Sequence, residues 1–217
     1  MTDFAVLRER MVTRDISARG IADPLILAAF RAVPRELFIA EELAAYAYDD
    51  GPLPIEAGQT ISQPYIVALM VAAAAIKPGD RVLEVGAGSG YAAAVMGRIA
   101  GEVVAIERQP DLAHIARERL ARLGYDNVTV VEGDGSTGWP DRAPYDAILA
   151  AASGSHVPQA LIDQLAHVGR LVMPVGERSW VQRLVKVTKQ AEGGTSREDL
   201  GGVRFVPLIG EEGWSDG

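Results

Sequence analysis

The sequence predicts an α/β fold in which helices flank a mixed sheet of seven strands. Short apolar runs rich in Val, Ile and Leu alternate with longer Ala-rich or amphipathic stretches, a pattern typical of parallel strands joined by helices. A glycine-rich turn follows the first of these runs, as expected where a strand leads into a helix beside a ligand. Near the C-terminus two strand-like runs follow each other without an intervening helix. We therefore expect five strands in βα alternation and a late antiparallel pair.

The expected strands are short and mostly β-branched, as buried strands of a parallel sheet are. In chain order they lie at residues 82–85, 103–106, 127–131, 145–150, 169–175, 180–188 and 203–209. Expected helices of the main domain lie at residues 64–76, 91–100, 110–123 and 161–165. Residues 191–202 contain Gly193 and Gly194 and are expected to form a flexible, hairpin-like loop.

The first 57 residues are predicted to form an N-terminal helical extension packed on a main domain at residues 58–217, the two making one compact unit. Phe4, Leu7 and Met11 recur at helical spacing, and Gly20 can end that helix. The pair Asp23–Pro24 then starts a second helix, with Asp as the N-cap and Pro at the first helical position.

Composition and charge exclude several classes of function. The chain has 29 acidic and 21 basic residues, whereas a duplex-binding surface needs clustered Lys and Arg, so we expect no nucleic-acid partner. Its densest basic stretch, residues 117–122, is expected to be a solvated helix face. The lack of Cys excludes disulfides, thiolate catalysis and Cys-based metal sites, and no other metal cluster is visible. No apolar run has the length of about 18 residues that a membrane span needs, and the start does not resemble a secretory signal, so we expect a cytoplasmic protein.

Residues 81–107 form a βαβ unit with a glycine turn after its first strand and an acid about 20 residues further on, the outline of a nucleotide-cofactor site. A dinucleotide fingerprint needs Gly or Ala where Tyr91 stands, and Glu84 would face a pyrophosphate with a second negative charge. S-adenosylmethionine carries an ammonium, a sulfonium and a ribose diol, which suit Glu84 and Glu107. We therefore favour this methyl donor. A dinucleotide, or a glycine turn that binds nothing, are the alternatives.

Thr60 and Ser62 lie just before the helix expected to start at Pro64. Ser62 or Gln63 falls at its N-cap, so the simplest interpretation of Ser62 is a cap contributing about 1 kcal/mol. The functional alternative uses the same geometry, because a helix N-terminus and neighbouring hydroxyl groups can hold a carboxylate.

Two further residues have open interpretations. Asp134 and Gly135 follow the third strand at the sheet edge where α/β folds bind ligands, and an acid there could accept a hydrogen bond from an adenine amino group. The alternative for Asp134 is a simple turn residue. His114 lies off the apolar stripe of its helix and is expected to face solvent.

Taken together, several stretches resemble the protein-L-isoaspartate O-methyltransferase family. They are spread over nearly the whole chain: RGI, VPRELFI, AYAYDDGPLPIEAGQTISQPYIVALM, VLEVGAGSGYAAAV, GRLVMPVG and VRFVPLIG. The glycine motif alone is common to class I methyltransferases, whereas GQTISQPYIVA just before it is far more specific. The chain departs from the family pattern at residues 153–156, where LAAASGSHVP inserts Ser and Gly, and at Ile209, where a threonine is frequent.

The resemblance implies a class I methyltransferase (Rossmann-like) sheet, S-adenosylmethionine as donor and L-isoaspartyl residues of damaged proteins as acceptors. It implies that Ser62 is the catalytic hydroxyl at the substrate carboxylate, with Thr60 beside it as a substrate-binding residue. The cofactor-binding residues that it implies are Ile61, Glu84, Gly86, Gly88, Glu107, Asp134 and Gly135. We expect a monomer that binds isoaspartyl peptides and proteins and no metal. The rival interpretations are a methyltransferase for a small molecule or other acceptor and a non-catalytic donor-binding module.

Overall fold

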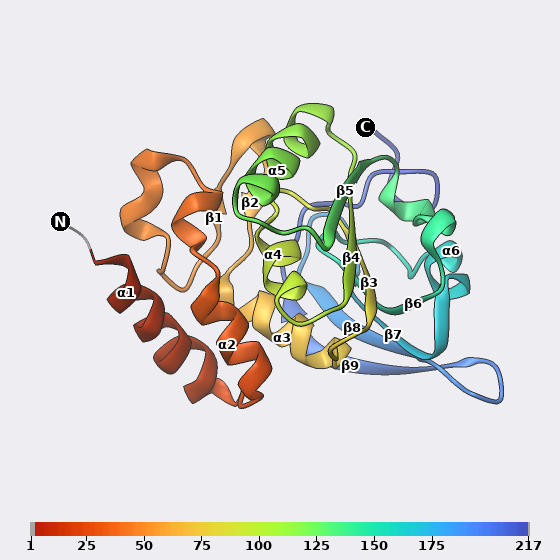
Figure 1. The fold of residues 1–217 in the computed structure, drawn as a ribbon. Coiled ribbons are helices and arrows are strands. Elements are labelled where there is room, and N and C mark those ends of the chain that lie inside the picture. The colour runs from red at the N-terminus through yellow and green to blue at the C-terminus, as the bar shows by residue number, and fades with distance from the viewer. Residues whose placement is uncertain (1–2, 217) are drawn as a thin grey trace.

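The computed structural model describes residues 3–216. Within that range a central sheet has seven strands in the order β5-β4-β3-β6-β7-β8-β9 (Figure 1). The strands are β3 (Arg81–Val85), β4 (Glu102–Glu107), β5 (Val128–Glu132), β6 (Tyr145–Ala150), β7 (Leu165–Val175), β8 (Gln182–Lys189) and β9 (Thr195–Val203). The neighbours from β5 to β7 are parallel, whereas β8 and β9 each run antiparallel to the strand before them. The predicted mixed sheet, with five parallel strands and two antiparallel ones, is confirmed.

Alternate residues of the central strands point into two apolar layers. Val82 packs with the helices α3 (Pro64–Ala74), α4 (Tyr91–Gly97) and α5 (Pro110–Arg122). Leu83 faces the opposite layer, which includes the short helix α6 (Gln159–Asp163). Each of these helices overlaps a range expected from sequence. The carboxyl ends of the parallel strands are left open between the two layers, which is where ligands bind in such sheets.

The N-terminal segment is helical, as predicted. It contains α1 (Phe4–Arg10), a π-helical stretch Met11–Ile16, a 3-10 turn Ser17–Arg19 that ends at Gly20, and α2 (Pro24–Ala32). The Asp23 carboxylate caps α2 by accepting from the backbone N–H groups of Leu25 and Ile26. Two more 3-10 segments follow, Arg35–Phe38 and Glu41–Tyr46.

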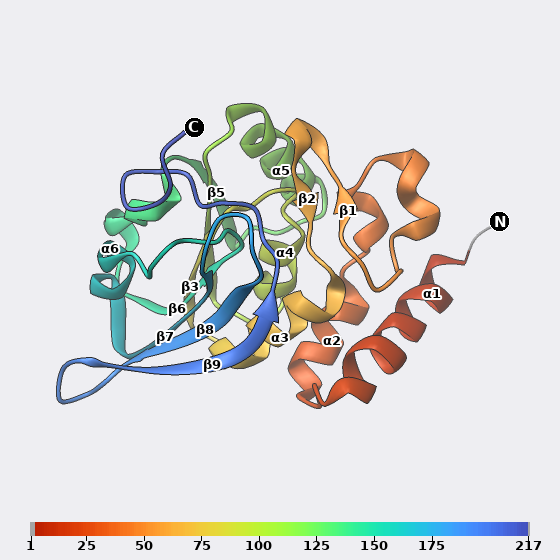
Figure 2. The same cartoon turned by 180° about the vertical axis from the view of Figure 1, so that it is seen from behind.

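This segment shares one core with the sheet and lies along its α3–α4 side (Figure 2). Phe30 and Phe38 meet the ring of Tyr91 edge-on, with centroids 6.2 and 5.6 Å away. The expected boundary between residues 57 and 58 falls in the turn of a small hairpin, made of β1 (Leu53–Pro54) and β2 (Thr60–Ile61). The hairpin therefore carries the chain directly from the N-terminal segment into α3.

The last strand differs from the prediction. β9 occupies Thr195–Val203, part of the range expected to be a flexible loop, and pairs along its whole length with β8. The turn is confined to residues 190–194, where Gly193 and Gly194 adopt positive φ. The sequence TSRED is polar because this strand lies at the exposed edge of the sheet, so its composition resembles that of a loop. Residues 204–209, expected to be a strand, form only isolated bridges at Pro207 and Ile209.

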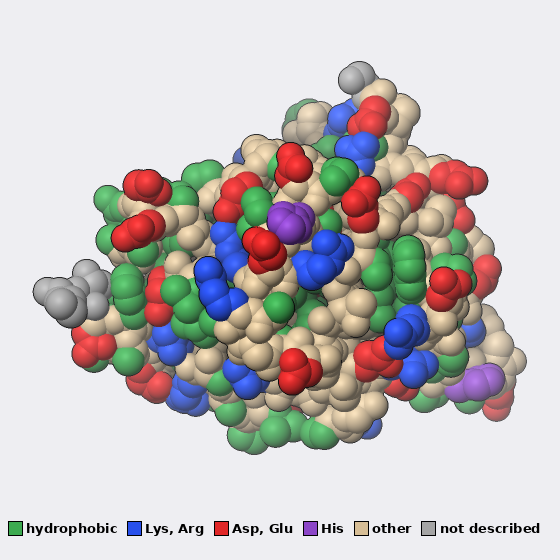
Figure 3. Space-filling model, turned by 45° about the horizontal axis from the view of Figure 1, so that its top comes forward, with side chains coloured by type: hydrophobic (Ala, Val, Ile, Leu, Met, Phe, Trp, Pro, Cys, Tyr) green, Lys and Arg blue, Asp and Glu red, His purple; other side chains and the backbone are tan. Residues whose placement is uncertain are grey.

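The surface has mixed charge on the face drawn in Figure 3, where acidic and basic side chains are interspersed. Across residues 3–216, no helix combines the length and apolar character that a membrane crossing requires.

Candidate functional site

A cleft of about 800 Å³ opens at the carboxyl ends of the central strands. The β1–β2 hairpin contributes Thr60 and Ser62 to one end of its lining. The cleft lining also contains the predicted donor-site residues Gly86, Gly88, Glu107 and Gly135. Residues 203–209 complete the wall, including Phe205 and Ile209. Thus six of the predicted site residues, from segments far apart in sequence, lie around one cavity.

A narrower recess continues from this cleft, because the two share Thr60, Ser62, Gly86 and Gly88 among their lining residues. The recess adds Ile61 and Glu84, so eight of the predicted site residues line the two connected spaces. Asp134 lies outside them.

The glycine turn between β3 and α4 is shaped by backbone contacts. The N–H groups of Gly86 and Ala87 both donate to the Ile106 carbonyl on the next strand, each at 2.9 Å. Gly86 has φ of +86°, a left-handed conformation that disfavours other residues. At Gly90 a Cβ atom would lie 3.2 Å from a Leu120 methyl group, so the turn also permits α5 to pack closely. These contacts direct the turn past the cleft.

Glu84 is the most unusual polar group of the recess. It lies on β3 with only 2% of its surface exposed, and its Oε2 atom has no hydrogen-bond partner within residues 3–216. Burial, and next the negative charge of Glu107, raise the pKa of Glu84 well above its ordinary value. A buried acid of this kind fits a cationic ligand group, because an ammonium would supply both a donor and a compensating charge.

Glu107 ends β4 and holds the glycine turn in place. Its Oε2 atom accepts from the Gly88 N–H at 2.9 Å, and its Oε1 atom accepts from the Gln109 N–H at 3.0 Å. Each carboxylate oxygen can accept a further hydrogen bond, for example from a ribose hydroxyl. The residues present therefore fit the methyl donor: an unpartnered buried acid, a glycine cradle and an acceptor for a diol.

Ser62 does not act as the cap of α3. The residue preceding the helix is Gln63, and no side-chain capping bond is formed there. Among residues 3–216 the Ser62 hydroxyl makes no hydrogen bond, whereas its backbone carbonyl accepts from Arg35 Nη2 at 2.9 Å. The capping interpretation is therefore wrong. Ser62 itself lines the cleft, with a hydroxyl that has no hydrogen-bond partner in the described part of the chain.

Asp134 has the turn role that sequence suggested. Its Oδ1 atom accepts from the Ser136 N–H at 2.8 Å and from the Ser136 hydroxyl at 2.7 Å. Its Oδ2 atom accepts from the Glu211 N–H at 2.7 Å, which joins the C-terminal segment to β5. Asp134 lines an adjoining space with Arg108 and Ile209, both of which also line the main cleft. Whether it also receives adenine remains a prediction.

Arg119 is a residue that sequence reasoning misplaced. It lies within the stretch expected to be a solvated face, yet it is only 9% exposed. Its guanidinium donates to Glu56 Oε1 at 2.6 Å and to the Ser89 carbonyl at 3.4 Å. It thereby links the β1–β2 hairpin to the glycine turn. The sequence did contain a signal for this burial. Arg119 follows Ala116 by three residues, and residues at that interval lie on the same face of a helix.

The structure also places His114 and the segment that departs from the family pattern. His114 faces solvent as predicted, with 65% of its side chain exposed. The departing segment at residues 153–156 joins the cleft wall, since the Ser153 N–H donates to the Val206 carbonyl and the Leu208 N–H donates to the Ser153 carbonyl, both at 2.8 Å. No group of three or more potential metal-ligating side chains occurs in the described part of the chain.

Comparison with known proteins identifies close relatives. The family model described as protein-L-isoaspartate (D-aspartate) O-methyltransferase matches residues 7–213. Protein-L-isoaspartate O-methyltransferase 1 of Rhodopseudomonas palustris (strain HaA2) is 60% identical over 214 residues, covering 99% of this chain and 87% of that protein. Protein-L-isoaspartate O-methyltransferase of Methanoculleus marisnigri is 55% identical over 207 residues, covering 95% of this chain and 93% of that protein.

The chain is also similar to solved structures that are described under the same activity. A protein-L-isoaspartate O-methyltransferase superposes with a TM-score of 0.86 at 32% identity, covering 94% of this chain and 66% of that one. A Plasmodium falciparum structure described under the same activity, in complex with S-adenosyl-L-homocysteine, gives a TM-score of 0.80 at 28% identity. That alignment covers 93% of this chain and 98% of the Plasmodium chain.

Proposed function

Because the chain belongs to the protein-L-isoaspartate (D-aspartate) O-methyltransferase family and shares the class I methyltransferase fold, we propose that it methylates the α-carboxylate of L-isoaspartyl residues in damaged proteins. The methyl donor is S-adenosylmethionine. The observation that supports this most directly is one connected cavity with a free hydroxyl, that of Ser62, and a buried free acid, Glu84. The first suits an anionic acceptor and the second a cationic donor.

The donor half of the site is built by the central strands. S-adenosylmethionine, when bound, supplies a methyl group activated by its sulfonium. Glu84 would accept from the donor's ammonium and Glu107 from the ribose hydroxyls. Gly86 and Gly88 would border the methionine part, with Ile61 lining the pocket beside them. Asp134 and Gly135 would meet the adenine.

The acceptor half needs positioning rather than proton transfer. A substrate α-carboxylate has a pKa of roughly 3.5, so it is already an anionic nucleophile at neutral pH and requires no general base. The Ser62 hydroxyl would donate to one carboxylate oxygen and Thr60 would border the acceptor. Holding a nucleophile and its target in line can lower a barrier by about 7–11 kcal/mol in favourable cases.

The methyl ester then reacts further on the substrate. The backbone nitrogen that follows the isoaspartyl residue attacks the ester carbonyl, methanol leaves, and a succinimide ring forms. Water opens the ring at either carbonyl, which returns part of the product to normal aspartate. We propose that these steps occur on the substrate without further groups of this chain, in a cytoplasmic, monomeric enzyme.

The test is incubation with methyl-labelled donor and two peptides that differ only in an isoaspartyl or an aspartyl residue. We expect base-labile label on the isoaspartyl peptide alone. Equal labelling of both peptides, or of neither, would reject the proposed acceptor. A protein that binds S-adenosylhomocysteine in calorimetry yet labels neither peptide would be a methyltransferase for another acceptor or a non-catalytic donor-binding module.

A further inference from the structure

Arg35 is a fully buried arginine in the 3-10 segment Arg35–Phe38, directly behind Ser62. Its Nε atom donates to the Ala47 carbonyl at 2.8 Å, and its Nη2 atom donates to the Ser62 carbonyl at 2.9 Å. One rigid guanidinium therefore bridges two backbone positions on either side of the β1–β2 hairpin. Arginine suits this task because its donors have a fixed, planar arrangement.

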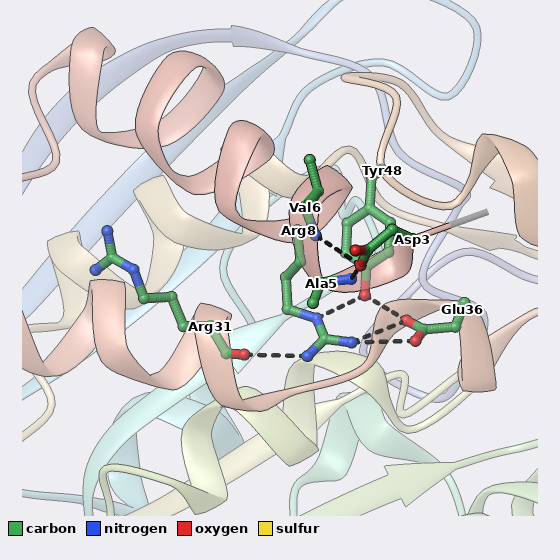
Figure 4. A network of polar contacts seen from close by, with 7 residues as sticks. All are labelled: Asp3, Ala5, Val6, Arg8, Arg31, Glu36 and Tyr48. Atoms are coloured by element: carbon green, nitrogen blue, oxygen red, sulfur yellow. Dashed lines mark hydrogen bonds and ion pairs between the residues drawn. The ribbon is translucent and has the colours of Figure 1, made fainter. Parts of the chain in front are cut away.

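The residues next to Arg35 and Ala47 belong to a second polar network. Arg8 donates through Nε to the Tyr48 hydroxyl at 2.7 Å and through Nη2 to Glu36 Oε1 at 3.0 Å (Figure 4). The Tyr48 hydroxyl also donates to Glu36. Glu36 and Tyr48 are the immediate neighbours of Arg35 and Ala47, so this network fixes both ends of the first Arg35 hydrogen bond.

Within residues 3–216 Arg35 has no acidic partner at ion-pair distance, although the charge of Asp50 acts on it from further away. Among residues 3–216 it forms no ion pair, and its Nη1 atom is buried without a hydrogen bond. The guanidinium lies over the Tyr91 ring at 4.7 Å. Asp50 is engaged by Arg19 Nη1 and Gln63 Nε2, each at 2.8 Å. A buried cation without a direct ion pair next to Ser62 favours an anion at the Ser62 hydroxyl.

We propose that Arg35 is a positioning residue for the acceptor carboxylate. It fixes the backbone of Ser62 and so the direction of the hydroxyl, and its positive charge attracts the anion that this hydroxyl binds. The role rests on the proposed function, since it takes Ser62 as the acceptor contact. It gives the N-terminal segment a direct effect on the site.

The test compares Arg35→Lys and Arg35→Met with a matched control, Arg170→Lys. Arg170 likewise bridges two carbonyls, those of Ala74 and Ala75, both at 2.7 Å, but it does so at the other end of α3. We expect kcat/KM for an isoaspartyl peptide to fall about tenfold in Arg35→Lys, which keeps the charge, and about a hundredfold in Arg35→Met. Arg170→Lys should stay within about twofold of the parent, and S-adenosylhomocysteine affinity should change by no more than about twofold in all three.

A double variant separates positioning from general loss of structure. In a Ser62→Ala background, Arg35→Lys should lower kcat/KM by less than about threefold, because the group that it positions is gone. An unchanged kcat/KM in Arg35→Lys, an equal loss with and without Ser62, or a loss matched by Arg170→Lys would overturn the role of Arg35. If Arg35→Met does not fold, the kcat/KM of Arg35→Lys with and without Ser62 is sufficient to test the role of Arg35. Absence of isoaspartyl methylation by the parent enzyme would instead reject the proposed function.

Discussion

Glu84 and Glu107 lie on adjacent parallel strands and point to the same face of the sheet. Glu84 is level with Ala105 in the β3–β4 register, and Glu107 is two residues further along β4. Within residues 3–216 neither carboxylate forms an ion pair. The proposed donor site thus contains two neighbouring acids, and Glu84 is almost completely buried. That arrangement is unfavourable for the folded protein by itself and becomes favourable when a cation binds.

We predict that Glu84→Gln stabilises the free protein and abolishes donor binding. Burial raises the pKa of Glu84 in the folded state, so above the unfolded pKa of roughly 4.3 folding must take up a proton or bury a charge. The contribution of Glu84 to the free energy of unfolding therefore decreases as pH rises from its pKa in the unfolded state toward its pKa in the folded state. Glutamine removes this penalty, and we expect a gain of about 1 kcal/mol in the free energy of unfolding at pH 7, measured by urea denaturation.

Asp146→Asn is the control for a β-strand acid outside the cleft. Asp146 Oδ2 accepts from the Arg81 N–H at 2.8 Å, so this change should destabilise the protein and spare donor affinity. A destabilised Glu84→Gln protein that still binds S-adenosylhomocysteine normally would contradict the role of Glu84.

Donor binding should also depend on pH. In the free protein the raised pKa of Glu84 favours its protonated form, whereas a bound ammonium favours the ionised form. Affinity for S-adenosylhomocysteine should therefore rise with pH up to the pKa of Glu84 in the free protein, and binding below that pH should release a proton. Calorimetry in two buffers with different ionisation enthalpies measures this release. Glu84→Gln should release none from this site, and the same proton release in the variant would contradict the assignment.

Local sequence rules were sufficient for most of the fold. Buried strands such as 103–106 and 145–150 are apolar because both faces are covered, so their pattern is unambiguous. The sequence did not predict β9, because an exposed edge strand is polar and resembles a loop in composition. Its extended conformation depends on hydrogen bonding to β8. Residues 204–209 read as a strand, yet Pro207 lacks an N–H, and this stretch serves as a cleft wall instead.

The site was less predictable than the fold. Glu84 and Glu107 follow from the position of the glycine turn on a parallel strand, a local rule. Arg35 and Arg119 act on loops 27 and 63 residues away from them in sequence, and no periodicity records such contacts. The hydroxyl of Ser62 could be separated from a helix cap only when the exact start of α3 was known.

Ser62→Ala should reduce turnover strongly and leave donor binding almost unchanged. The hydroxyl has no partner to lose in the part of the chain that the structure describes, so the fold should tolerate its removal within about 0.5 kcal/mol. Loss of a hydrogen bond to a charged carboxylate typically costs about 1.5–3 kcal/mol, which corresponds to a 10- to 100-fold lower kcat/KM. Steady-state kinetics with an isoaspartyl peptide and calorimetry with S-adenosylhomocysteine give the two values. Unchanged turnover would remove Ser62 from the mechanism.

Arg119→Met should loosen the hairpin against the glycine turn. The Arg119 side chain is 10% exposed and that of Glu56 is 35% exposed, so the pair is stronger than a surface ion pair and weaker than a fully buried one. We expect a loss of about 2 kcal/mol in unfolding free energy and weaker donor binding. Arg122→Met, on the exposed side of α5, is the control and should change stability by less than about 0.5 kcal/mol. Equal stability of the two variants would show that the link does not hold the hairpin.

Asp134→Asn tests whether one carboxylate serves both the C-terminal loop and the adenine. An amide nitrogen at Oδ2 would face the Glu211 N–H, and one at Oδ1 would face the Ser136 N–H, so either orientation loses an acceptor. We expect faster hydrogen exchange at Glu211 and weaker binding of S-adenosylhomocysteine.

The adenine contact is isolated by the S-inosyl analogue, which has a carbonyl in place of the adenine amino group. The parent protein should prefer the adenosyl compound by about tenfold, and Asp134→Asn should lose most of that preference. Gly213→Ala is the control, because its Cβ would meet the Leu208 carbonyl oxygen and so disturb the C-terminal loop without touching the Asp134 carboxylate. If Asp134→Asn and Gly213→Ala lower affinity alike and both keep the preference, Asp134 holds the loop and does not bind the adenine amino group.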